Sequence, residues 1–300
     1  MPGSTSLLAE PLGPSLGIQA QLPILLAEYP FRTQQDIADY LHLLQDLPRY
    51  FSDLIALEQE KSRQGVFQND LAVDGIIRQC SAFLADADTP EIHLLHTVFQ
   101  NKLQASSLFS EAERNLCLQT HEKLLTSCVF PAYRSLSDAL SSLRGKGTQN
   151  AGGLSRQEGG LSYYAYLLRS RVGVDASPEE LTRLLTQQLA DQCAEMQIIL
   201  DQNPSLSLSE QALVLPFSTP EEMLADLQNA VSEDFPVLSG IAYEVKTVDD
   251  SLKDFLSPAF YLTPPADVNS PNSIYLNPAD EMTGIELYST LAHEGFPGHL

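Results

Sequence analysis

Helix-start signals recur along this chain, and they constrain its fold more than any other feature of the sequence. Residues 177–180 are Ser-Pro-Glu-Glu, and residues 219–222 are Thr-Pro-Glu-Glu. Each segment joins a capping box to a proline in the first turn of a helix. Thr89 is likewise followed by Pro90. These signals predict helices over about 178–200, 220–231 and 90–103, and hence a mainly α-helical chain.

Apolar residues at helical spacing extend this pattern through the first half of the chain. Ile37, Tyr40 and Leu44 follow a start signal at residues 33–36. Because proline removes a helical hydrogen bond, we expect the next proline, Pro48, to end this helix. We expect further helices over about 50–62, 70–84 and 110–143, the last one bent at Pro131.

The pattern changes twice further along the chain. Residues 145–160 are rich in Gly, Ser, Gln and Asn, which is typical of a loop, and a helix resumes at about 161–168. Residues 242–248 alternate like a strand. The apolar runs at 259–263 and 273–277 flank a turn rich in Pro and Asn, and this arrangement indicates a hairpin.

The predicted fold is therefore mainly α. It is a multi-helix architecture with a small β-sheet or hairpin at about 242–277, before a last helix that Thr283–Glu286 caps. We expect residues 1–300 to form part of one large helical domain. An alternative subdivision places a helical region at 1–147, and a second region with the sheet and the last helix at 148–300.

The chain is strongly acidic, with a formal charge of −22 from 39 acidic and 17 basic residues. Such a surface repels phosphate backbones and anionic lipids, so nucleic acid and membrane surfaces are not expected partners. No stretch of about 18 apolar residues is present, and residues 1–14 lack the features of a signal peptide. We expect a cytoplasmic protein on the sequence as it stands, and an exported protein or lipoprotein if a signal precedes Met1. The four cysteines form no C-x-x-C pair and are expected to be inert thiols.

The most informative motif lies at residues 293–299, which are His-Glu-Gly-Phe-Pro-Gly-His. A zinc hydrolase needs imidazole or carboxylate ligands, an open position for water and a carboxylate as general base. The usual helical solution is H-E-x-x-H, which places both histidines on one face of the helix. Here Pro297 occupies the fourth position after His293, and the second histidine is His299.

This wider spacing requires a bend in the chain. On an ideal helix, six residues advance a side chain by about 600° and about 9 Å, so His299 would point about 120° away from His293. Pro297 and Gly298 are the residue types that most readily break a helix. We therefore expect a bend across residues 296–298 that returns His299 to His293.

The helix before the motif carries a polar stripe, because Glu286, Ser289, Thr290 and His293 are spaced to share one face. Such a stripe suits hydrogen bonds that orient a metal ligand. It fits the solvated face of an ordinary amphipathic helix as well, so the spacing alone leaves both interpretations open.

The motif resembles the His-Glu-x-x-Pro-Gly-His signature of the bacterial domain of unknown function 885 family. That family consists of proposed metallopeptidases related to thimet-like zincins. The resemblance covers the chain from about residue 10 to residue 300 through further blocks in the same order. These blocks are Gly17–Tyr29, Gly159–Tyr164, Ser257–Leu262, Ile274–Asn277 and Thr290–Glu294.

The resemblance implies a zinc-dependent peptidase with a zincin-like architecture. His293 and His299 are then zinc ligands, and Glu294 is the general base that activates the attacking water. The strand at 273–277 becomes an edge on which a peptide substrate pairs, with Tyr275 and Asn277 as substrate-binding residues. A third ligand, a glutamate, is expected beyond Leu300, so this chain is expected to be an incomplete fragment that is inactive by itself.

The other histidines do not form a comparable motif, and two other functions fit the same sequence. His121 and Glu122 begin like the zinc motif but lack the second histidine, and His93 and His96 have no evident carboxylate partner, so packing roles are expected for all of them. The alternatives are a non-catalytic helical binding or scaffold protein, and a metal-dependent amidase or esterase that uses the same site. The sequence contains no indication of an oligomeric state.

Overall fold

A computed structural model describes most of the chain. The described residues are 5–14, 17–147, 153–204, 215–235, 240–248, 253, 257–264, 266, 270–277, 282 and 284–300. The chain divides into two compact units. Unit 1 comprises residues 1–149, 246–260 and 275–280, and unit 2 comprises residues 150–245, 261–274 and 281–300.

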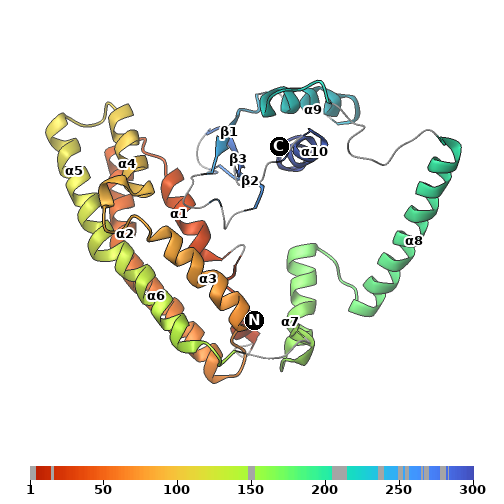
Figure 1. The fold of residues 1–300 in the computed structure, drawn as a ribbon, viewed down its shortest axis with the longest axis horizontal. Helices are drawn as coiled ribbons and strands as arrows, with labels where there is room; N and C mark the ends of the chain where they lie inside the picture. The colour runs from red at the N-terminus through yellow and green to blue at the C-terminus, as the bar shows by residue number, and fades with distance from the viewer. Residues whose placement is uncertain are drawn as a thin grey trace. The chain divides into compact units, whose positions relative to one another are not determined.

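Unit 1 is a bundle of helices around one apolar core (Figure 1, red to yellow-green). Its helices are η1 (Thr5–Leu8), α1 (Ile18–Glu28), α2 (Gln34–Arg63), α3 (Asp70–Phe83), η2 (Pro90–Ile92), α4 (Leu94–Ala105), α5 (Glu111–Leu124), η3 (Leu125–Val129) and α6 (Phe130–Leu143). Tyr40, Phe51, Phe99 and Tyr133 are fully buried in this core. The amphipathic patterns in the sequence therefore supply the apolar faces that meet at its centre.

Helix α2 corrects one prediction, because it continues through Pro48 instead of ending there. The Thr33–Asp36 capping box at its start is confirmed. Leu44, Leu47, Phe51 and Leu54 are all buried on one side of α2. The apolar face thus continues across the proline, and its burial outweighs the one hydrogen bond that Pro48 removes.

Two other helix boundaries differ from the prediction. The segment after Thr89 is a short 3-10 helix, and α4 begins only at Leu94. His93 separates the two helices because its backbone is extended, and its side chain caps α4 by accepting a hydrogen bond from the Leu95 amide. Near Pro131 the predicted long helix is interrupted by the π-helical segment η3 between α5 and α6.

Unit 2 contains η4 (Gly153–Arg156), α7 (Gly160–Leu167), η5 (Leu168–Val172), α8 (Pro178–Gln202), α9 (Pro220–Asp234) and α10 (Gly284–Glu294). The capping boxes predicted before α8 and α9 are confirmed by side-chain and backbone hydrogen bonds at both helix starts. None of the described residues of α8 is buried. The predicted cap at Thr283 and part of the 145–160 loop lie outside the described residues.

The predicted small sheet is confirmed and has three strands, β1 (Tyr243–Thr247), β2 (Ala259–Leu262) and β3 (Asn272–Leu276), in the order β1-β3-β2. The prediction that the strand at 273–277 is an edge is wrong. β3 is the middle strand, so its backbone groups are already paired on both sides. A peptide substrate therefore has no free edge on β3, and only β1 or β2 offers one among the described strands.

The described helices include none that is long and apolar enough to cross a membrane. The four cysteines are free, and of these Cys80 is buried and Cys193 is exposed.

Three of the other histidines have packing roles in unit 1, as predicted. His93, His96 and His121 are all buried. The His121 ring stacks on Phe99 and lies 3.2 Å from the Tyr40 hydroxyl and 3.4 Å from Nδ1 of His96. Burial, with smaller contributions from His96 and His93, lowers the pKa of His121 to about 3.

We expect this histidine to make unit 1 sensitive to acid. Above pH 6.5 the ring is neutral in both the folded and the unfolded chain, so His121 adds no pH dependence. Below pH 6.5 only the unfolded chain binds a proton, and the free energy of unfolding falls until about pH 3. This contribution amounts to about 2 kcal/mol between pH 6.5 and pH 5.

Urea unfolding of the wild type and of His121→Phe across this pH range measures the contribution. Phenylalanine keeps the ring stacking but cannot titrate, so its stability should fall less steeply with acid. The exposed His42 provides the control, because His42→Ala should keep the wild-type slope. Equal slopes for the wild type and His121→Phe would contradict the prediction.

Candidate functional site

The motif residues lie at the C-terminal end of α10, where the chain turns back on itself. The amide of Gly295 still bonds to the carbonyl of Leu291, in the helical pattern. The amide of Gly298 then bonds to the carbonyl of Ala292 at 3.0 Å, and the amide of His299 bonds to the carbonyl of His293 at 3.1 Å. The Phe296–Pro297 peptide bond within this turn is cis.

The turn brings the two motif histidines together, which confirms the predicted bend. Their ring centroids are 5.1 Å apart, with an angle of 87° between the rings. Two imidazoles that bind one tetrahedral ion at about 2.1 Å have centroids roughly 5 Å apart. The separation of His293 and His299 therefore fits two ligands of a single zinc ion.

Two glycines permit this close turn. A Cβ atom on Gly298 would lie 1.8 Å from the carbonyl oxygen of His293, and a Cβ atom on Gly295 would lie 2.8 Å from that of Leu291 and 2.5 Å from the side chain of Leu224 on α9. No side chain fits at either position without moving the backbone or the neighbouring helix. Gly295 and Gly298 are therefore required because a larger residue has no room for its Cβ atom.

The aromatic residue of the motif anchors the turn. Phe296 is buried, and its ring packs edge-on against Tyr243 of β1 at 5.7 Å between centroids. Earlier on α10, Tyr288 donates a hydrogen bond to Asp226 of α9 at 2.7 Å and stacks on Phe217. The Tyr288 contacts join α10 to α9, and the Phe296 contact joins the turn after α10 to β1.

Glu294 lies beside the second histidine. Its Oε2 atom is 3.8 Å from Nε2 of His299, and its side chain is 13% exposed, compared with 48% for His299. The site therefore combines two imidazoles that solvent can reach with one carboxylate that is largely sheltered. This is the donor set of a metal ligand pair with an adjacent base.

Tyr261 contacts His299 and Asn272 contacts Tyr261, and neither residue was predicted from the sequence as part of the site. The Tyr261 ring stacks on the His299 ring at 5.2 Å, with 13° between the planes. The Tyr261 hydroxyl donates to Oδ1 of Asn272 at 2.6 Å, and Nδ2 of Asn272 donates to the carbonyl of Ala242. The only signal for Tyr261 was its place in the 257–262 block, because its contact with His299 joins residues far apart in the chain.

The polar stripe of α10 contributes less than the metal interpretation expects. Ser289 donates its hydroxyl proton to the carbonyl of Glu286, and Thr290 donates to the sulfur of Met282. A ligating histidine donates its second ring N–H to an acceptor, and among the described contacts neither hydroxyl oxygen accepts such a bond from His293. For Ser289 and Thr290, the interpretation as an ordinary helix face is the better one.

Tyr275 and Asn277 belong to unit 1, whereas the motif residues belong to unit 2. Tyr275 is buried and stacks on Phe260 at 4.9 Å. Asn277 is also buried, and its side chain donates to the carbonyl of Lys253 at 2.6 Å. The Asn277 amide is therefore already bonded to the chain at Lys253, and a substrate-binding role for either residue stays a prediction.

Across the part of the chain that the structure describes, no three His, Cys, Asp or Glu side chains are grouped so that they could hold a metal ion. Catalytic zinc sites usually have three protein ligands, and the described residues bring only two candidate ligands, His293 and His299, together.

Comparison with known proteins places the chain in a known fold. The model of the family described as "Bacterial protein of unknown function (DUF885)" matches residues 6–300. A crystal structure described as "the putative lipoprotein from Colwellia psychrerythraea" superposes with a TM-score of 0.77 at 19% sequence identity. The match covers 96% of this chain and 53% of that one, so the chain spans about half the length of the solved structure. No protein with a curated description matches the chain.

Proposed function

The chain belongs to the DUF885 family of bacterial proteins of unknown function, and within that family we propose that it supplies part of the active site of a zinc-dependent peptidase. The single observation that supports this proposal is the return of His299 to His293 at the end of α10. The solvated face of an ordinary amphipathic helix does not require a contact between His293 and His299. A pair of ligands for one ion requires such a return.

The residues of the proposed site have separate roles in metal binding and in proton transfer. His293 and His299 bind the metal, and stacking on Tyr261 orients the His299 ring. Glu294 lies beside His299 with its side chain largely buried, and it acts as the general base that accepts the proton of the attacking water. When bound, zinc polarises the scissile carbonyl and lowers the pKa of water to about 7.

Zinc binding by the whole protein tests the ligand assignment. We expect one zinc ion for each chain, and we expect His293→Ala and His299→Ala each to weaken zinc affinity by at least about 100-fold, because even residues that only orient ligands contribute 10- to 100-fold. Competition with a chelating dye measures the affinity, and atomic absorption measures the stoichiometry.

The exposed His42 is the matched control, and His42→Ala should retain wild-type zinc affinity. If both motif variants bound zinc as the wild type does, the ligand assignment would be wrong. The scaffold alternative would then become the better description of the fold. An esterase or amidase would keep the zinc result and differ only in the substrate that is cleaved.

We also propose that the whole protein acts at the cell envelope. The support is the solved structure of similar fold, whose description is "the putative lipoprotein from Colwellia psychrerythraea". Fractionation of cells that produce the protein from its complete gene should recover it with the envelope. Recovery entirely in the cytosol would overturn this placement.

A further inference from the structure

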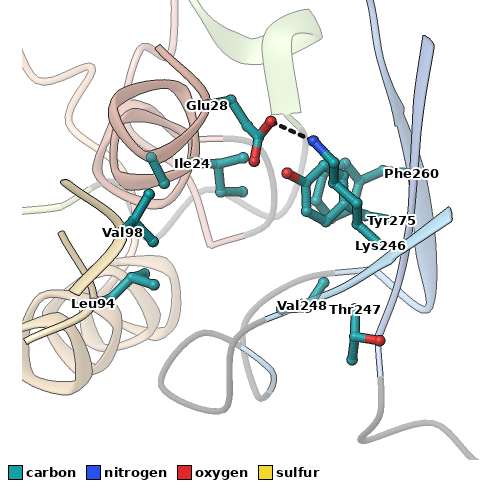
Figure 2. Close-up of a pocket in the computed structure, with 10 residues that line it drawn as sticks. Ile24, Glu28, Leu94, Val98, Lys246, Thr247, Val248, Phe260 and Tyr275 are labelled. Atoms are coloured by element: carbon teal, nitrogen blue, oxygen red, sulfur yellow. Dashed lines mark hydrogen bonds and ion pairs between the residues drawn. The ribbon is translucent and has the colours of Figure 1, made fainter. Parts of the chain in front are cut away.

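A cavity of about 380 Å³ lies within unit 1, and none of its lining residues belongs to the proposed zinc site. Its walls come from α1, α4 and the sheet strands, and most of the lining is apolar (Figure 2). Ile24, Leu94, Val98, Val248 and Phe260 supply aliphatic and aromatic surface. The volume falls in the range of sites for small molecules, about 300–1,000 Å³.

One end of the cavity is polar. Nζ of Lys246 lies 2.7 Å from Oε2 of Glu28, and Figure 2 shows this pair beside the Tyr275 ring. The Lys246 ammonium also lies 5.8 Å from the centre of that ring. An ammonium can donate up to three hydrogen bonds, so its pairing with Glu28 does not by itself use all the donors of Lys246. The cavity thus has an apolar body and a cationic end.

A second lysine, Lys102, lies near this end of the cavity. Lys102 interacts electrostatically with both Glu28 and Lys246, and it donates hydrogen bonds to the carbonyls of Ala27 and Tyr29. Burial lowers the pKa of Lys102 to about 8, so it remains mostly charged at neutral pH. Although burial opposes it, hydrogen bonds from Lys246 and Tyr275 lower the pKa of Glu28 and keep this carboxyl ionised.

Among the described residues whose charges interact here, Lys102, Lys246 and Glu28 sum to +1, in a chain whose formal charge is −22. The C-terminal carbonyls of α1 contribute about half a negative charge, which leaves the sum over these described groups positive. An anionic group is therefore attracted to this end of the cavity, whereas an ammonium group would meet two like charges.

We propose that this cavity binds a small monocarboxylate with an aliphatic chain or a single aromatic ring. The carboxylate contacts Lys246, and the apolar body packs against Ile24, Val98 and Phe260. This site does not depend on the proposed peptidase activity, and none of its residues takes part in zinc binding.

Calorimetric titration of the 300-residue chain with octanoate, octanol and octylamine tests the proposal. We expect octanoate to bind at one site, and octanol and octylamine to bind at least about tenfold more weakly, because a hydrogen bond to a charged group is worth about one order of magnitude in affinity. Equal affinity for octanoate and octanol, or no saturable binding of octanoate, would overturn the proposal.

Two variants locate the site. Lys246→Met should weaken octanoate binding about tenfold while leaving octanol binding unchanged, and Val98→Phe should remove octanoate binding because the larger ring fills the cavity. If Val98→Phe fails to fold, Ala27→Leu fills the same cavity from α1. The exposed Lys123 is the matched control, and Lys123→Met should bind octanoate like the wild type. Unchanged octanoate binding in Lys246→Met, or in a folded cavity-filling variant, would exclude this cavity.

Discussion

Replacing Glu294 with glutamine is expected to lower peptide cleavage by the zinc-loaded whole protein by about 100- to 10,000-fold, the usual contribution of a general base. The amide has nearly the same size and shape as the carboxylate but cannot accept a proton from water. Because Glu294 approaches His299 no closer than 3.8 Å, the substitution removes no direct hydrogen bond to a proposed ligand. We therefore expect zinc content to remain at the wild-type value.

The measurement is cleavage of a mixed peptide library, followed by mass spectrometry, with zinc determined in the same samples. Glu286 is the matched control, because it is exposed on the same helix about two turns earlier. Glu286→Gln should retain wild-type cleavage. Full activity in Glu294→Gln would show that Glu294 is not the base, and this would hold even if zinc binding by His293 and His299 had been confirmed.

Replacing Gly298 with alanine is expected to weaken zinc affinity by at least about 100-fold without altering either histidine. The added Cβ atom would lie 1.8 Å from the carbonyl oxygen of His293, a separation that real contacts do not allow. The turn must therefore open, and the hydrogen bond from the His299 amide to His293 is lost. His299 then moves away from the position that one ion shared with His293 requires.

The same chelator competition measures this effect, and circular dichroism shows whether the helices remain. Gly13 provides a matched control, since a Cβ atom there meets nothing within 4 Å. Gly13→Ala should bind zinc like the wild type. Wild-type zinc affinity in Gly298→Ala would mean that the observed turn does not position the ligands. The His293→Ala and His299→Ala variants test the ligands themselves, so the two results are separable.

The helices were predictable because their signals are local. A capping box joins residues three apart, as at Ser177 and Glu180, and the structure contains the predicted hydrogen bonds there. The prediction that the helix ends at Pro48 was wrong because contacts with other helices, and not local signals, decide the outcome there. The local cost of one proline is small beside the burial of Leu44, Leu47 and Phe51 on the same helix face, and that burial depends on packing with other helices.

In the sheet and in the site, too, features set by local residues were predictable and contacts between distant residues were not. The strands at 242–248, 259–263 and 273–277 were predictable from alternation and turn residues, but their order was not. A strand pattern contains no information on which neighbours flank it, and so β3 was expected at an edge although it lies in the middle. For the same reason Tyr261 was missed, because its stacking on His299 joins positions 38 residues apart (299 minus 261).

The sequence by itself determined the mainly helical fold, the small sheet, the family and the two histidines whose spacing demanded a bend. These properties follow from residue types and from hydrogen bonds within a few positions. Only the tertiary structure decided that the bend returns His299 to within 5.1 Å of His293 between ring centroids, and that Lys246 and Glu28 meet at the end of an apolar cavity. Both arrangements depend on close packing between elements distant in the chain, and no local pattern specifies that packing.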